Sequence, residues 1–174
     1  MNHAQVGADP VEKERAVASR RWRLTAWVYG SSALVYAADR VTKAVVEAQL
    51  AHRPPVVVVP RVLRFTYTTN PGGAFGLFGR APYLFLAATL VVCAAIIVAS
   101  FSSHSRVLSV GLGLVLGGAL GNLTDRVVRG TGLNGRVVDF IDFRVWPVFN
   151  LADSAIVIGA ALILLAGVRR AASR

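Results

Sequence analysis

Two aspartates in the last third of the sequence have the setting of catalytic acids. Asp139 lies between large apolar residues in a loop, and Asp153 lies where that loop becomes the last apolar segment. Two carboxylates held together in a dry site cannot both ionise, so one pKa rises and the pair shares a proton. Such a pair can activate water and polarise a carbonyl, which suits peptide hydrolysis. The alternatives are a helix cap at Asp153 and ion pairs with Arg136 or Arg144.

Other catalytic arrangements find little support in the sequence. Cys93 is the single cysteine, which excludes a disulfide framework, and it lies among small apolar residues where a packed thiol is expected. The three histidines are scattered without a spacing that suits a metal. No serine or threonine has an evident base partner. The sequence therefore indicates neither a metal nor a cofactor.

The composition indicates a membrane protein. The chain has 174 residues, of which 55% are hydrophobic and 16% are charged, and its mean hydropathy is +0.56. A soluble domain carries about 25% charged residues, so a soluble globule and a disordered chain are both disfavoured. The net charge of +10 comes largely from basic residues that flank the apolar segments. This distribution favours contact with anionic lipid over nucleic-acid binding.

Four apolar segments are long enough to cross a bilayer, which takes about 20 helical residues. They cover 24–38 (with a pattern that runs on to about 46), 81–101, 107–124 and 145–168. We therefore predict a membrane α-helical fold with four transmembrane helices. An even number of spans and the basic flanks place both termini in the cytoplasm. A signal peptide ending near Ala37 is the alternative for the first segment.

The loops between these segments complete the predicted organisation. Residues 56–59 are β-branched and residues 63–69 alternate like a strand, which predicts a small extracytoplasmic β-structured cap. Residues 130–146 contain glycines, acids and Trp146, which suits a short interfacial segment. The predicted domains are a disordered basic tail over 1–22, a four-span unit over 23–168 and a basic tail over 169–174.

Polar side chains of three predicted spans share one depth. Asp39, Asn122 and Asp153 each lie 15 residues from the inner end of their segment, which is about 22 Å along a helix. Asp125 and Arg126 lie one turn higher. Intramembrane polar groups are costly and usually mark function, so this common depth predicts a site just below the outer surface.

Structural explanations for the same residues stay open. Asp39 and Lys43 share a helix face and can form a local ion pair. Asn122 and Asp125 also share a face and can serve helix packing. Glycines 117, 118 and 121 permit another helix, or a substrate helix, to approach closely.

Five strings of the sequence resemble the ordered motifs of the bacterial lipoprotein signal peptidases, also called signal peptidase II. The resemblance covers residues 24–168, in the family's order and at about its spacings. The strings are Asp39-Arg40-Val41-Thr42-Lys43, Asn70-Pro71-Gly72-Gly73-Ala74-Phe75, the ten residues from Gly117 to Arg126, Val137-Val138-Asp139-Phe140-Ile141 and Phe149-Asn150-Leu151-Ala152-Asp153-Ser154.

The resemblance implies an aspartic endopeptidase of the bacterial inner membrane whose active site lies near the extracytoplasmic face. Its substrate would be a diacylglyceryl-modified prolipoprotein, cut just before the lipidated cysteine by a monomer in contact with membrane lipid. Globomycin-type cyclic peptides would inhibit it. The family's catalytic pair falls on Asp139 and Asp153. Its supporting residues fall on Asp39, Lys43, Asn70, Gly118, Asn122, Asp125, Arg126, Asn150 and Ala152.

Three features depart from the family pattern or complicate it. Asn70 is followed by Pro-Gly-Gly, where the family has Thr- or Ser-Gly-Ala-Ala. The two catalytic positions are only 14 residues apart, which shortens the loop between them. Asp142 competes with Asp139 as a member of the pair. Two other classes of function stay open: a non-enzymatic membrane protein that binds ions or lipid head groups, and an intramembrane transferase acting on lipids.

Overall fold

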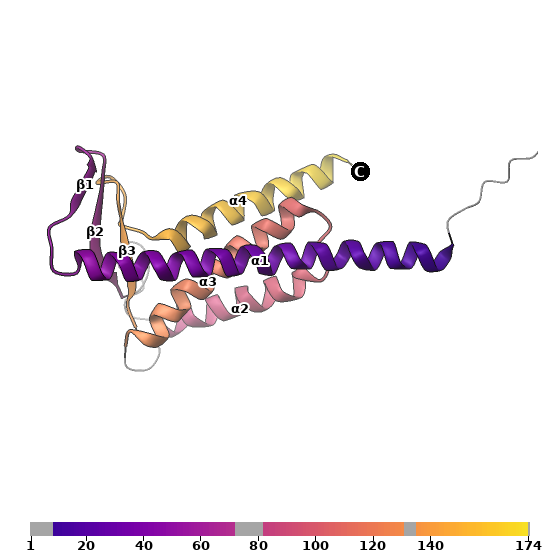
Figure 1. Cartoon of the computed structure of the whole chain (residues 1–174), viewed down its shortest axis with the longest axis horizontal. Helices are drawn as coiled ribbons and strands as arrows, with labels where there is room; N and C mark the ends of the chain where they lie inside the picture. Colours follow the sequence, from indigo (N-terminus) through magenta and orange to yellow (C-terminus); the bar gives the residue numbers. More distant parts are fainter. Residues whose placement is uncertain (1–8, 72–81, 131–134, 174) are drawn as a thin grey trace, which may run out of the picture.

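The computed structural model describes residues 9–71, 82–130 and 135–173. These residues form four helices that run side by side, with a small antiparallel sheet across one end of the bundle (Figure 1). The elements in chain order are α1 (Pro10–Leu50), β1 (Val56–Val59), β2 (Leu63–Asn70), α2 (Pro82–Ser100), α3 (Arg106–Val128), β3 (Val137–Asp142) and α4 (Leu151–Ala172).

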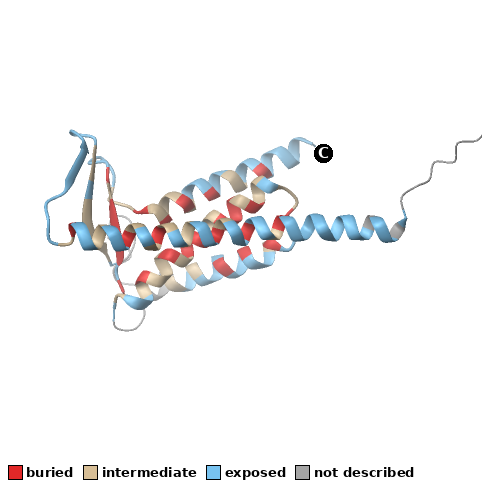
Figure 2. Ribbon diagram, in the orientation of Figure 1, coloured by how far each residue is buried: buried red, intermediate tan, exposed pale blue. Residues whose placement is uncertain are grey.

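Helix α1 is longer than the sequence pattern suggested. It has 41 residues, which corresponds to about 60 Å and exceeds the thickness of a hydrocarbon core. Asp9 caps its start by accepting a hydrogen bond of 3.1 Å from the backbone of Val11. The expectation of a disordered tail over 1–22 is therefore wrong for residues 10–22, which are helical and largely exposed (Figure 2). Residues 1–8 lie outside the described part of the chain.

Two described helices, α3 and α4, are long and apolar enough to cross a membrane. Residues 86–100 of α2 form a shorter apolar stretch, and α1 carries charged residues along its length. Helix α4 begins at Leu151 and not near residue 145 as predicted. Pro147 disfavours helix at the residue before it, and Asn150 caps the helix start with its side chain.

Helix α3 packs closely against α1 and α4 through its glycines. A Cβ atom added to Gly117 would lie 2.5 Å from the carbonyl oxygen of Ser32 in α1. At Gly118 it would lie 2.5 Å from the carbonyl oxygen of Ala152 in α4. The backbones therefore approach to a distance that side chains would prevent. The expectation that these two glycines admit a substrate helix is wrong, because the protein's own helices occupy both faces.

The sheet has the order β1-β2-β3, with both pairs antiparallel. Its first two strands confirm the β-structured cap predicted from the sequence. The third strand was not expected, because it comes from the loop predicted as an interfacial segment. In its register Thr68 pairs with Asp139 and Asn70 pairs with Val137. The pairing of β2 with β3 thereby brings Asn70 to the strand that carries Asp139.

Candidate active site

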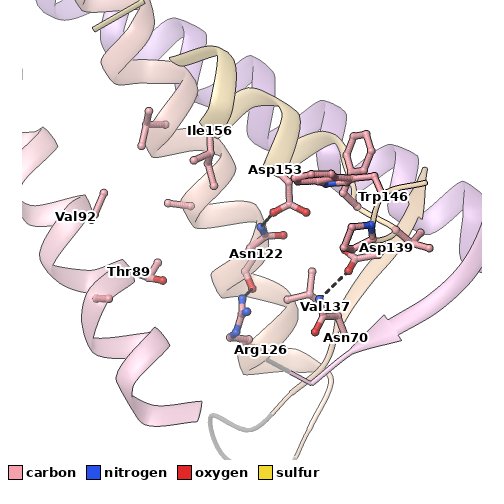
Figure 3. A pocket seen from close by; sticks show the side chains of 16 residues that line it. Asn70, Thr89, Val92, Asn122, Arg126, Val137, Asp139, Trp146, Asp153 and Ile156 are labelled. Carbon is pink, nitrogen blue, oxygen red and sulfur yellow. Dashed lines mark hydrogen bonds between the residues drawn. The ribbon is translucent and has the colours of Figure 1, made fainter. Parts of the chain in front are cut away.

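A pocket of about 410 Å³ lies between α2, α3, the start of α4 and the sheet. Asp139 and Asp153 both line it, and their side chains lie on the same side of the pocket in Figure 3. One wall is polar and the other is built largely of small and branched apolar side chains. The lining residues are Asn70, Ala88, Thr89, Val92, Val115, Ala119, Asn122, Arg126, Val137, Asp139, Trp146, Pro147, Val148, Phe149, Asp153 and Ile156.

Asp139 is held on β3 by two amide side chains. Its Oδ2 accepts a hydrogen bond of 3.1 Å from Asn70 Nδ2, and its Oδ1 accepts one of 2.7 Å from Asn150 Nδ2. The residue is only 3% exposed. Burial raises the pKa of Asp139 to about 6, and the nearby charge of Asp153 adds to this rise. The two hydrogen bonds oppose the rise, since each favours the ionised form.

Asp153 is the third residue of α4 and belongs to a capping box. The N-cap is Asn150, whose side chain accepts a hydrogen bond of 2.9 Å from the backbone of Asp153. In return Asp153 Oδ2 accepts one of 3.2 Å from the backbone of Asn150. The Oδ1 atom of Asp153 accepts the carboxylate's second hydrogen bond, of 2.8 Å, from Asn122 Nδ2. The sequence alternative of a capping aspartate is therefore correct in part, with the N-cap position held by Asn150.

One amide group connects the two aspartates. Asn150 Nδ2 donates both to Asp139 Oδ1 and, at 3.2 Å, to Asn122 Oδ1. Asn122 in turn donates to Asp153. Asn150 is fully buried, and it also fixes the first turn of α4. Strand β3 and helices α3 and α4 are thereby joined through their side chains beside the pocket that both carboxylates line.

Behind the pocket, the ammonium of Lys43 connects α1 to α3. Its Nζ lies 2.9 Å from Asp39 Oδ2, from Asp125 Oδ2 and from Asn122 Oδ1. The side chains of Lys43, Asp39 and Asp125 are all fully buried. The ammonium therefore forms ion pairs with two carboxylates and donates a hydrogen bond to one amide oxygen. Lys43 does not line the pocket, so this geometry favours the structural explanation of the ion pair.

Asp39 and Asp125 extend this network to the backbone of the site. Asp39 Oδ1 accepts a hydrogen bond of 3.1 Å from the backbone of Ala152, one residue before Asp153. Asp125 Oδ2 accepts one of 3.2 Å from the backbone of Val138, one residue before Asp139. Each buried aspartate therefore positions the chain next to one member of the candidate pair.

Three charged residues of this network were not predicted as site residues from the sequence: Arg40, Glu47 and Arg129. Asp125 pairs with Arg40 of α1, and with Arg129 at 3.1 Å. Arg129 also forms a bidentate pair with Glu47, with distances of 2.7 and 2.8 Å. Their opposite charges near the C-terminal ends of α1 and α3 were the available signal. Sequence alone does not say which ends face each other.

The remaining predicted residues lie at or beside the pocket. Arg126 lines it and donates a hydrogen bond of 3.2 Å to the backbone carbonyl of Asn122. Gly118 lies against Ala152 at the crossing of α3 and α4. Trp146 and Thr89 also line the pocket and were not predicted. The turn that follows Pro71 lies outside the described residues.

Asp142 is excluded from the candidate pair by its contacts. Its Oδ2 lies 2.5 Å from Arg64 Nε, and its Oδ1 accepts a hydrogen bond of 2.7 Å from the backbone of Arg144. These contacts lower the pKa of Asp142 despite its burial. It does not line the pocket. Arg136, an available partner for the pair, donates instead to Thr69.

Two solved structures with a similar fold are described as bacterial membrane enzymes. One, described as a bacterial membrane enzyme, matches with a TM-score of 0.73 and 29% identity, covering 83% of this chain and 88% of its own. A second with the same description matches with a TM-score of 0.67 and 32% identity, covering 78% and 88%. The fold and the apolar helices α3 and α4 support a location in the membrane.

Sequence comparison defines the family. The family model for signal peptidase (SPase) II matches residues 31–169. A lipoprotein signal peptidase of Pelotomaculum thermopropionicum is 48% identical over 133 residues, which cover 75% of this chain and 84% of the relative. One from Streptomyces coelicolor is 42% identical over 156 residues, which cover 87% and 74%. The chain belongs to the signal peptidase II family of peptidases, as its motifs suggested.

Proposed function

We propose that this protein removes the signal peptide from diacylglyceryl-modified prolipoproteins and cuts the bond before the lipidated cysteine. Asp139 and Asp153 would act as a pair that activates water. The observation that carries this proposal is the shared pocket, in which both carboxylates face one cavity and are joined through Asn150. Membership of the signal peptidase II family supports the choice of substrate.

In the proposed mechanism Asp139 holds the proton that the pair shares. Its pKa is raised to about 6 by burial and by the charge of Asp153. Asp153, whose carboxylate accepts hydrogen bonds from Asn122 Nδ2 and from the backbone of Asn150, would be the member that acts as the base. A neutral acid next to an ionised one provides both the hydrogen-bond donor and the base that amide hydrolysis needs.

The reaction would proceed in two steps. Asp153 takes a proton from water as the water oxygen attacks the scissile carbonyl carbon, and Asp139 gives its proton to the carbonyl oxygen. The product of this step is a gem-diol. In the second step Asp153 protonates the departing nitrogen of the cysteine while Asp139 takes a proton from one hydroxyl of the gem-diol. The C–N bond breaks, and both carboxyl groups return to their starting states.

The pocket's two walls suggest how the substrate would lie. The amides of Asn70 and Asn122 and the guanidinium of Arg126 lie on the polar side, where they can bind an extended peptide backbone. The apolar side includes Val92 of α2 and Ile156 of α4, which suit the lipid chains of the substrate. A globomycin-type cyclic peptide would compete for the same space.

The proposed topology places this pocket near the extracytoplasmic face. All four helices would cross the bacterial inner membrane, with both termini in the cytoplasm and the sheet outside. The basic residues at the start of α1 and the end of α4 support this orientation. The candidate site is assembled from one chain, which supports action as a monomer.

The test uses purified full-length protein in detergent with a diacylated precursor. We expect Asp139→Asn and Asp153→Asn each to lose at least about 1000-fold in cleavage rate, because either change removes half of the proton exchange. Asp142→Asn is the matched control, since it changes a neighbouring buried aspartate on the same strand that is paired with Arg64. Cleavage is measured by the shift in precursor size on a gel. The wild type and Asp142→Asn should produce this shift, and the two pair variants should not.

Two results would contradict the proposal. One is complete processing by either pair variant with the fold intact. The other is a diacylated precursor that stays uncleaved in the presence of the wild-type protein, which would favour a non-enzymatic function for the polar pocket.

A further inference from the structure

A second, basic pocket lies at the end of the bundle opposite the sheet, where α1 passes the connection between α2 and α3 (Figure 1). Its volume is about 380 Å³, which is within the range of small-ligand sites. Three guanidinium groups line it, from Arg20, Arg23 and Arg106. No carboxylate is among its described lining residues, which also include Ser19, Trp27, His104 and Ser105.

This pocket has a fixed wall. Arg20 donates a hydrogen bond of 3.2 Å to the backbone carbonyl of His104, and Arg21 donates one of 3.3 Å to that of Phe101. The connection between α2 and α3 is thereby tied to α1. Ser105 caps α3 by accepting a hydrogen bond of 3.2 Å from the backbone of Leu108. The positive end of the α3 dipole adds to the charge of the arginines.

Two of the three arginines, Arg23 and Arg106, make no polar contact with the described part of the protein. Within residues 9–71, 82–130 and 135–173, the side chains of Arg23 and Arg106 are exposed and form no hydrogen bond or ion pair. The planar guanidinium binds phosphate oxygens through paired N–H donors, and it does so better than an ammonium. The geometry therefore suits a phosphate group bound between α1 and the start of α3.

Apolar grooves adjoin the basic pocket on two sides. One groove of about 310 Å³ shares Trp27 and Arg106 with it and continues along Val110 and Leu162. The other, of about 680 Å³, shares Trp27 and Arg23 with it and continues to Leu114. Trp27 thus lines all three, and a tryptophan at such a border is typical of the membrane interface.

We propose that this region is a binding site for one anionic glycerophospholipid. Its phosphodiester would lie between Arg23 and Arg106, and its two acyl chains would follow the two grooves. The pairing of one basic pocket with two apolar grooves selects a two-chain lipid over a soluble phosphate. This inference rests on the proposed topology, which places the region at the cytoplasmic face. It is separate from the peptidase site, because Arg23 lies 16 residues from Asp39, which is about 24 Å along α1.

The test is native mass spectrometry of the full chain in detergent with equal amounts of phosphatidylglycerol and phosphatidylcholine that carry identical acyl chains. We expect the wild type to retain one phosphatidylglycerol in preference to phosphatidylcholine. The double variant Arg23→Gln/Arg106→Gln should lose this preference by about tenfold or more. The matched control is Arg169→Gln/Arg170→Gln, which removes the same charge from exposed residues at the end of α4.

Three results would overturn the inference: no preference in the wild type, equal losses in the two double variants, or full displacement by inorganic phosphate at the lipid's own concentration. The last result would indicate a phosphate site to which the grooves contribute nothing. Precursor cleavage in detergent without anionic lipid should be the same for the wild type and for both double arginine variants. A failure of lipid binding would therefore leave the Asp139–Asp153 proposal untouched, and loss of cleavage in the pair variants would leave lipid binding untouched.

Discussion

Replacing Lys43 by methionine tests the buried charge network most directly. The network is balanced, because the cations of Lys43, Arg40 and Arg129 face the anions of Asp39, Asp125 and Glu47. Lys43→Met keeps the apolar stem and removes only the ammonium. Asp125 retains its two arginine partners, whereas Asp39 loses the cation that lies 2.9 Å from its Oδ2.

The expected loss follows from the burial of both groups. Removing one partner of a buried pair costs about 3–5 kcal/mol, because the other charge stays buried without compensation. For a chain of this size that corresponds to a fall in Tm on the order of 10 °C. The measurement is thermal unfolding of the purified protein in detergent, followed by circular dichroism.

A double-mutant cycle with Asp39→Asn separates charge from packing. Asp39→Asn/Lys43→Met restores the charge balance, so the double variant should be more stable than the sum of the two single losses predicts. The reasoning would be refuted if Lys43→Met lost less than about 1 kcal/mol, or if the two losses were additive. Either result would mean that water reaches the pair and that its burial is incomplete.

Three further predictions concern the pair and the helix packing. Since Asp139 must hold a proton and its pKa is raised to about 6, the cleavage rate should fall above that pH by up to about tenfold per pH unit; a rate that stays flat to pH 8 would exclude this assignment. The folded-state pKa of Asp139 lies above its usual 3.8, so the free energy of unfolding should increase as the pH falls from above 6 toward 4; an equal increase in Asp139→Asn, measured by chemical denaturation, would assign the effect to another group. Gly118→Ala should destabilise the protein by about 1–3 kcal/mol, since the new Cβ would lie 2.5 Å from a backbone oxygen. Gly30→Ala, with open space at its Cβ, should keep or slightly raise the Tm in the same assay.

Much of the candidate site could be predicted from the sequence. Asp39, Asn122 and Asp153 share a depth because helices rise by a fixed distance per residue, and the structure joins these residues through Lys43 and direct hydrogen bonds. The glycines of α3 also predicted close helix packing. The local charge pattern could not predict the contact between Arg129 and Glu47, because it depends on which helices are neighbours.

The sequence by itself determined the apolar segments, the two strands of the first loop and the residue types that can share a proton. These properties depend on periodicity and composition within short stretches of chain. Only the tertiary structure decided that residues 137–142 form a strand, that Asn150 caps α4 while it contacts Asp139, and that Asp142 is paired with Arg64. Each of these follows from contacts between residues distant in sequence or from the path of a loop, and no local pattern records which of several similar aspartates will be buried with an arginine.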